Sequence, residues 1–115
     1  MLRSKKIRTR VNYKKYTLPL SEKDRLFVRF YLQRGKIVNF TLQYHSLIEK
    51  RWRVIRRYDT KHGVAHEHRF YFRNRRKQRK IILGDKADYN AIFTKSQSIV
   101  KKNYQKIKQN YFLNK

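Results

Sequence analysis

Three of the four histidines of the chain fall within seven residues, close to an aspartate, and these residue types can do chemistry. The group consists of Asp59, His62, His66 and His68. Imidazole and carboxylate groups are suitable ligands for transition metals. An imidazole oriented by a carboxylate can also act as general acid or base on a ribose 2′-hydroxyl or a phosphate, with an arginine to stabilise charge. In a third, architectural interpretation, Asp59 and His62 cap a turn while His66 and His68 form hydrogen bonds in a small core or contact RNA.

We adopt the architectural interpretation, because clustered titratable residues often belong to structural networks rather than to catalytic sites. The sequence therefore predicts no catalytic residue, no bound metal and no cofactor. If the protein is an enzyme, its candidate catalytic residues are Asp59, His62, His66 and His68.

Charge dominates the composition. The 115 residues include 32 Lys and Arg against seven Asp and Glu, for a formal net charge of +25. Solubility requires a net charge of only about 2–8, and self-repulsion on this scale opposes compaction unless a polyanion neutralises it. No apolar run approaches the roughly 20 residues of a membrane-spanning helix, and aromatic residues, suited to stacking on bases, are spread through the basic stretches. We therefore expect a nucleic acid as partner, and no membrane.

The chain contains no cysteine. This excludes disulfides, thiolate zinc sites and cysteine nucleophiles. No signal-peptide pattern opens the sequence, so we expect a cytoplasmic protein.

The distribution of the cations favours RNA over DNA. They occur in the N-terminal segment, the third expected strand, an Arg/Lys-rich run and the C-terminal helix, which suits a protein embedded among several phosphate backbones, as in ribosomal RNA. No RNP aromatic motif, KH-type loop or zinc-finger spacing is present. The predicted RNA contacts are Arg3, Lys5, Lys6, Arg8, Arg10, Lys14, Lys15, Arg53, Arg56, Arg57, Arg73, Arg75, Arg76, Lys77, Arg79, Lys80, Lys101, Lys102, Lys106 and Lys108.

Several aromatic residues are candidates for stacking on bases. They are Trp52, Tyr58 and Tyr71 in the expected strands, and Tyr13 and Tyr16 near the N-terminus. For Trp52 we expect core packing instead, because large aromatic side chains dominate small cores. For the two N-terminal tyrosines we expect stacking, because that segment has no core of its own.

The expected architecture begins with a basic extended arm over residues 1–20, which has little periodicity and would be disordered alone. Residues 25–32 and 38–44 then alternate between apolar and other side chains, and a period of two indicates strands. Gly35 lies in the short turn between them, so the pair forms a hairpin. Further strands are expected over residues 52–58, 66–73 and 81–83, with a basic loop over residues 73–80.

A C-terminal amphipathic helix completes the expected fold. Apolar residues recur at spacings of three and four from Ile92 to Tyr111, and Asp85 is a plausible N-cap. The fold class is therefore α+β, an antiparallel meander of four to five strands followed by one helix. Residues 21–115 form a single domain, with the sheet at about 25–83 and the helix at about 86–111.

A local motif carries a family resemblance. The string Arg57-Tyr58-Asp59, two residues, His62-Gly63, two residues, His66, one residue, His68 resembles the TumE-type toxins of bacterial and archaeal toxin–antitoxin pairs. It is similar also to a set of uncharacterised small prokaryotic proteins that share this string. A weaker likeness extends from residues 38–44 to the end of the C-terminal helix. The resemblance implies that Asp59, His62, Gly63, His66 and His68 are characteristic positions of that family.

Three functional hypotheses follow. The first is a small structural component of the ribosome, expected to be archaeal, or a factor bound stably to it, that contacts rRNA and neighbouring ribosomal proteins. The alternative is a toxin-like ribonuclease that uses the histidine group and is paired with an antitoxin. The third and weakest is a DNA-compacting chromatin protein.

Overall fold

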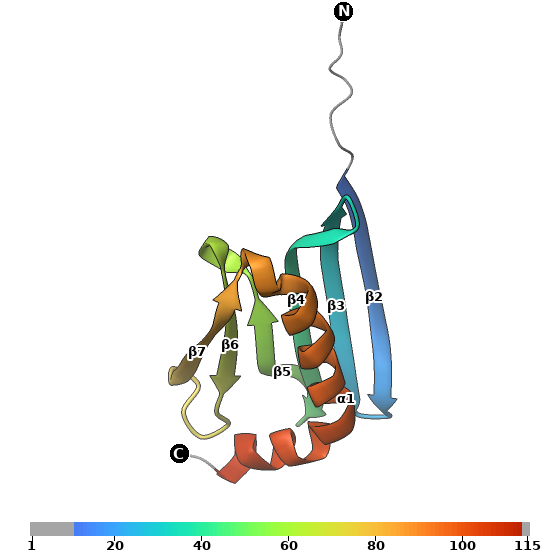
Figure 1. The fold of residues 1–115 in the computed structure, drawn as a ribbon. Coiled ribbons are helices and arrows are strands. Elements are labelled where there is room, and N and C mark those ends of the chain that lie inside the picture. The colour runs from blue at the N-terminus through green and yellow to red at the C-terminus, as the bar shows by residue number, and fades with distance from the viewer. Residues whose placement is uncertain (1–10, 114–115) are drawn as a thin grey trace, which may run out of the picture.

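The structure is a computed structural model, and it describes residues 11–113 of the chain. It contains one six-stranded antiparallel sheet whose strands follow one another in chain order, and a single long helix (Figure 1). The strands are β2 (Val11–Ser21), β3 (Asp24–Gln33), β4 (Lys36–Ile48), β5 (Arg51–Asp59), β6 (Val64–Phe70) and β7 (Gln78–Asp85). Short 3₁₀ turns, η1 (Lys61–Gly63) and η2 (Lys86–Asp88), precede β6 and the helix α1 (Tyr89–Leu113). The α+β class is confirmed.

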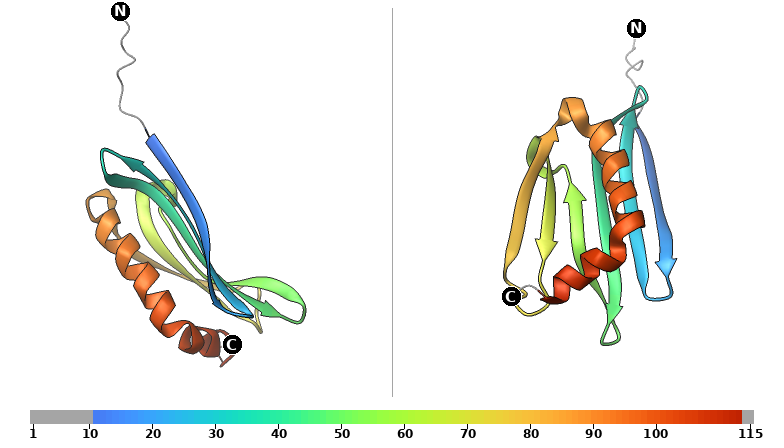
Figure 2. Two further views of the ribbon diagram at one scale, coloured as in Figure 1. Left: turned by 90° about the vertical axis from the view of Figure 1, so that its right-hand side faces the viewer. Right: turned by 60° about the horizontal axis from the view of Figure 1, so that its bottom comes forward.

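The helix covers only one face of the sheet (Figure 2). Its first half packs on the middle strands, where Phe93 contacts Phe30 and Phe40. The helix is kinked at Asn103, which has φ −125° and ψ 17°, and its second half turns towards the other end of the sheet. There Tyr111 contacts Phe72. The opposite face of the sheet has no covering layer in the described part of the chain.

The core lies between the sheet and α1, and it follows the expected periodicities. Alternate residues of β3 and β4 are fully buried, as Leu26, Val28 and Leu42 show. The helix presents the expected stripe, with Val100 fully buried near its centre. The carboxylate of Asp85 accepts a hydrogen bond from the Ala87 N–H at 3.1 Å, as expected of a cap. Sequence periodicity therefore predicted the inner face of the hairpin and of the helix.

The sheet has six strands rather than four or five, because residues 11–21 form β2 instead of an extended arm. β2 pairs with β3 along its whole length, from Val11 opposite Gln33 to Ser21 opposite Asp24. The free edge of the β3–β4 hairpin offers unpaired backbone N–H and C=O groups. The basic strand β2 can pair with this edge because its charged side chains remain in water. Residues 1–10, with the predicted contacts Arg3, Lys5, Lys6, Arg8 and Arg10, lie outside the described residues.

Other boundaries also differ from the expected ones. The sheet spans residues 11–85 and the helix residues 89–113, against expected limits of about 25–83 and 86–111. β7 begins at Gln78, so the end of the basic run expected to be a loop belongs to a strand. In the β3–β4 turn, Arg34 and Gly35 both have positive φ, 54° and 75°. This is the backbone of a two-residue type I′ hairpin turn.

Candidate functional site

The uncovered face of the sheet, defined as the side opposite α1, combines cations with aromatic rings. Strand register assigns its members, because residues paired across an antiparallel sheet point to the same side. Its cations are Lys15, Arg25, Arg29, Arg57 and Lys80, and its rings are Tyr13, Phe27, Tyr31, His45, Trp52, His66, His68 and Phe70. Positive charge and stacking surfaces therefore share one open sheet face.

One end of this face holds what we call the Trp52 cluster, consisting of Arg25, Phe27, His45 and Trp52. The Arg25 guanidinium carbon lies 3.9 Å above the centre of the Trp52 ring, and the Phe27 and His45 rings are stacked with an interplanar angle of 8°. Arg25 Nε donates to His45 Nδ1 at 3.1 Å. Burial, together with the charge of Arg25, lowers the pKa of His45 to about 4, so this ring is neutral at neutral pH.

The exposure of Trp52 corrects an expectation. Core packing was predicted, but the side chain is 40% exposed on the uncovered face. The cause is a β-bulge in β5, where His45 pairs with Val54 and Tyr44 pairs with Arg56. One extra residue in a strand reverses the side of the sheet to which the residues beyond it point. The pattern of residue types along one strand does not show where such a bulge lies, so the sequence did not predict the exposure of Trp52.

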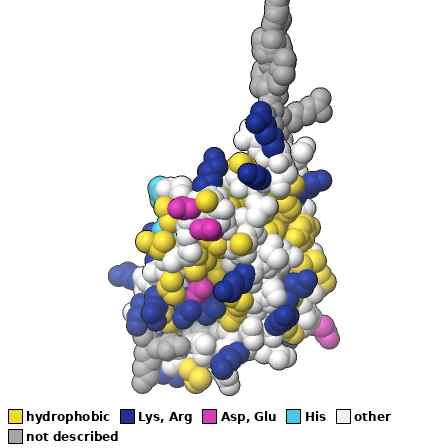
Figure 3. Space-filling view, viewed as in Figure 1, with side chains coloured by type: hydrophobic (Ala, Val, Ile, Leu, Met, Phe, Trp, Pro, Cys, Tyr) yellow, Lys and Arg dark blue, Asp and Glu magenta, His cyan; other side chains and the backbone are white. Residues whose placement is uncertain are grey.

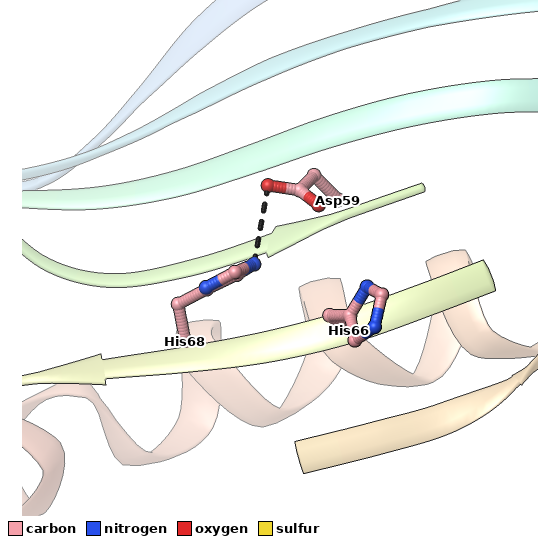
Figure 4. A group of neighbouring side chains, drawn as sticks. All are labelled: Asp59, His66 and His68. Atoms are coloured by element: carbon pink, nitrogen blue, oxygen red, sulfur yellow. Dashed lines mark ion pairs between the residues drawn. The ribbon is translucent and has the colours of Figure 1, made fainter. Parts of the chain in front are cut away.

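Near the middle of the face lies the Asp59 cluster, which consists of Asp59, His66 and His68 (Figure 4). Asp59 ends β5 and pairs in register with His66 of β6, and His68 follows two residues later on the same side. One ligand atom from each residue lies within 4.8 Å of the others. Asp59 Oδ2 and His68 Nε2 are 3.4 Å apart.

The partners of the Asp59 cluster orient two of its side chains. Arg57 Nε donates to Asp59 Oδ2 at 2.9 Å, and the Lys61 N–H donates to Asp59 Oδ1 at 3.3 Å. His68 Nδ1 lies 2.5 Å from Gln78 Oε1. His68 Nε2 is buried and has no hydrogen-bond partner among the described residues, because its 3.4 Å contact with Asp59 has the distance of an ion pair but not the geometry of a hydrogen bond.

A shallow hollow of about 630 Å³ borders the Asp59 cluster. The side chains of Arg29, Arg57 and Lys61 contribute positive charge to its walls. The remaining lining residues are Tyr31, Asn39, Phe40, Thr41, Gln43, Asp59 and Thr60. This combination of cations and hydrogen-bonding groups suits a phosphate.

Not every predicted site residue joins the cluster. His62 is exposed in η1, with φ 68°, and belongs to no ligand group within residues 11–113.

The predicted stacking residues differ in exposure. Tyr13 is 46% exposed on the uncovered face, whereas Tyr58 is only 1% exposed and cannot reach a base. Tyr16 hydrogen-bonds Gln97 of the helix. Tyr71 is half-buried, and the Lys77 ammonium nitrogen lies 5.0 Å from the centre of its ring.

Most of the predicted RNA contacts that the structure describes are exposed. These are Lys14, Lys15, Arg73, Arg75, Arg76, Lys77, Arg79, Lys80, Lys101, Lys102 and Lys106. Arg53, Arg57 and Lys108 are partly buried and pair with Glu49, Asp59 and Asp24. Arg56 does not fit the prediction: it lies under α1, 8% exposed, with NH1 3.9 Å from Glu67. Arg56 alternates with the buried Tyr58 and pairs with the buried Tyr44, so the strand places this arginine on the side that α1 covers.

Sequence reasoning assigned no site role to several residues of the uncovered face, among them Arg25, Arg29 and Gln78. Arg25 and Arg29 alternate with the buried side of β3, so the same period of two that predicted the strand could have placed them outside. Gln78 gave no such signal, because it contacts His68 only through the β6–β7 pairing.

Cations also cover the other side of the molecule. Figure 3 shows Lys and Arg side chains scattered over the face that carries α1, rather than gathered in one stripe. Lys95, Lys101, Lys102 and Lys106 of the helix are all exposed.

None of the helices in residues 11–113 has the length and apolar composition needed to cross a membrane. Residues 7–115 match a family model described as "Domain of unknown function (DUF7718)". Comparison with curated proteins and with solved structures found no match.

Proposed function

Because the chain belongs to the DUF7718 family, whose description assigns no function, we propose its function from its own geometry: it binds RNA, as a small structural component of a ribosome or a factor held stably on one. The observation that carries this proposal is that exposed cations occupy both sides of the molecule, while one sheet face also offers exposed aromatic rings.

The uncovered face supports contact with unpaired nucleotides. Trp52 and Tyr13, 40% and 46% exposed, offer flat surfaces for bases, and stacking on such rings contributes about 1–3 kcal/mol per base. Arg29 and Lys15, which pair across β2 and β3, lie between these rings and can contact the phosphates. No recognised motif for contacting base edges lies on this face, so the affinity for RNA should depend little on the nucleotide sequence.

The cations on the helix side support a large RNA partner. A single strand bound to the sheet would leave Lys95, Lys101, Lys102 and Lys106 without phosphates. A protein surrounded by several RNA helices can use both sides, and each neutralised phosphate releases counterions. Ribosomal RNA provides such surroundings.

The test combines a lysate measurement with binding assays. The protein should sediment with one ribosomal subunit in a high-salt sucrose gradient, in near-stoichiometric amount.

The binding assays use variants. Trp52→Ala should weaken binding of an rRNA fragment by about 5- to 100-fold. Leu113→Ala, which removes a side chain 68% exposed at the helix end, should leave this binding unchanged. Arg29→Ala should lower the salt slope by about one. Sedimentation at the top of the gradient, or tighter binding to duplex DNA, would overturn the proposal; the second result would favour a chromatin protein.

RNA cleavage is a second candidate, favoured by one observation: the structure brings Asp59 and two imidazoles together on a basic face. One imidazole would take the proton of a ribose 2′-hydroxyl, whose oxygen attacks the adjacent phosphorus, and the other would protonate the departing 5′-oxygen. Arg57 would stabilise the charge on the phosphate. His66→Ala should then stop cleavage of cellular RNA without loss of RNA affinity. Failure of the purified wild-type protein to cleave such RNA would exclude this candidate.

A further inference from the structure

We propose that Asp59, His66 and His68 form a binding site for a divalent transition-metal ion of the zinc class, with three protein ligands and an open fourth position. Two imidazoles and one carboxylate are a ligand set that such ions accept. This proposal does not depend on RNA binding. It revises the expectation of no metal, which the sequence suggested before the three side chains were known to converge.

The distances fit the ion. Zinc binds imidazole nitrogen and carboxylate oxygen at about 2.0–2.2 Å, so two ligands in a tetrahedral arrangement lie about 3.4 Å apart. Asp59 Oδ2 and His68 Nε2 are separated by 3.4 Å. The third ligand atom, from His66, belongs to the same group, all of whose atoms lie within 4.8 Å of one another. Small rotations of the half-exposed His66 ring would close this remaining distance.

The hydrogen bonding of His68 leaves its inner nitrogen as a ligand. Its Nδ1 lies 2.5 Å from Gln78 Oε1, and an amide oxygen only accepts, so Nδ1 carries the proton. In the neutral ring Nε2 then presents a lone pair, and it faces the carboxylate of Asp59, which is also an acceptor. A metal ion between them would give His68 Nε2 the partner that it lacks among residues 11–113. A histidine whose other ring nitrogen donates to an oxygen is the usual arrangement around bound metals.

A proton on His68 Nε2 is the competing explanation, because it would make an ion pair with Asp59. That explanation gives no role to His66, which forms no side-chain hydrogen bond within residues 11–113 although its ring lies beside both partners. A metal uses all three side chains. Asp59 is already oriented for this role, because Arg57 and the Lys61 N–H hold its two oxygens.

The charged surroundings define what the fourth position takes. Arg57 and Lys61 border the hollow beside Asp59, and these cations disfavour a dication unless an anion accompanies it. We therefore expect the bound ion to take a phosphate oxygen from solution or from a nucleotide. In this state the ligating nitrogen of each ring cannot also carry a proton, so metal binding and proton transfer by His66 are alternatives.

The full-length protein, freed of metal with a chelator, should be titrated with Co²⁺. We expect one equivalent to bind with the visible absorption of a four-coordinate ion, and Zn²⁺ but not Mg²⁺ to displace it. The ring nitrogens of His66 and His68 should shift in NMR spectra, while those of His45 should not. Absence of binding below millimolar Co²⁺ would overturn the proposal whatever the variants do.

Variants locate the site. Asp59→Asn and His68→Gln should each weaken Co²⁺ binding by about 100-fold or more, and Gln78→Ala by about 10-fold, as expected for a residue that supports a ligand. The matched control is His62→Ala, which removes a histidine of the same segment outside the cluster and should leave the affinity unchanged. Circular dichroism checks that each variant is folded. Full binding by Asp59→Asn, or loss with His62→Ala alone, would place the ion elsewhere and contradict the proposal.

Discussion

Asp24 and Asp59 are both buried at the end of a strand, 5% and 7% exposed, but their surroundings differ. Asp24 lies on the side of the sheet that α1 covers, and its carboxylate accepts hydrogen bonds from the hydroxyls of Ser21, Tyr44 and Ser46, each at 2.7 Å. Lys108 Nζ of the helix lies 3.5 Å from the same group. Every group that faces Asp24 donates a hydrogen bond or carries positive charge.

Asp59 lies on the uncovered side, and its surroundings are less complete. Arg57 and the Lys61 N–H donate to it, but the buried Nε2 of His68 faces it without a hydrogen bond. A carboxylate matched by donors on all sides stabilises the fold. A carboxylate that faces another acceptor stabilises it less, and such local inconsistency is typical of sites kept for function.

The largest expected effect is a difference in the free energy of unfolding between alanine substitutions at the two aspartates. Asp24→Ala leaves the buried hydroxyl of Tyr44 without its acceptor and leaves Ser46 with only the Lys23 carbonyl, and we expect the free energy of unfolding to fall by about 3 kcal/mol. Asp59→Ala in the metal-free protein should lower it by about 1 kcal/mol, because Arg57 is partly exposed and can turn to water. Urea denaturation at pH 7 measures both. Equal losses would contradict the distinction drawn between the two carboxylates.

A smaller effect compares two buried tyrosines. The hydroxyl of Tyr44 donates to Asp24 at 2.7 Å, whereas the hydroxyl of Tyr58 is buried near the Arg56 guanidinium and forms no well-aligned hydrogen bond in the described part of the chain. Tyr44→Phe should therefore cost about 1.5 kcal/mol, and Tyr58→Phe should be neutral to within about 0.5 kcal/mol or stabilising. Thermal and urea unfolding of the two variants provide the measurement. A large loss for Tyr58→Phe would show that this hydroxyl has a partner in solution.

The smallest expected effect is the loss, at acid pH, of the stability that Asp24 contributes. Burial alone would raise the pKa of Asp24, but hydrogen bonds from Ser21, Tyr44 and Ser46 and the charge of Lys108 outweigh it, and the pKa lies below the usual 3.8. The unfolded chain therefore binds this proton more readily, so the stabilisation by Asp24 is complete above about pH 4 and is lost as the pH falls through the lower folded value.

Asp24→Asn tests this linkage. The wild-type protein should be the more stable at neutral pH, and the difference between the two should shrink below about pH 4. Stability measured in urea between pH 2 and 7 provides the comparison, and Asp59→Asn serves as the control for a carboxylate on the other face. A difference for Asp24→Asn that stays constant down to pH 2 would rule out a lowered pKa.

The sequence by itself determined the features that depend on local periodicity. The period of two placed Leu26, Val28 and Leu42 inside the hairpin, and the spacing of three and four placed Val100 inside the helix. The same alternation put His66 and His68 on one side of a strand, whereas Asp59 was expected in a turn and ends β5 instead. Composition alone determined the charge of +25.

Only the tertiary structure decided which residues the other strands place together. The pairing of β2 with β3 depends on a free edge, and the exposure of Trp52 depends on a bulge. The contact of Gln78 with His68 depends on the register of β7. The physical reason is that side-chain direction along one strand follows from its own backbone, whereas pairing, register and bulges are set by the neighbouring strand.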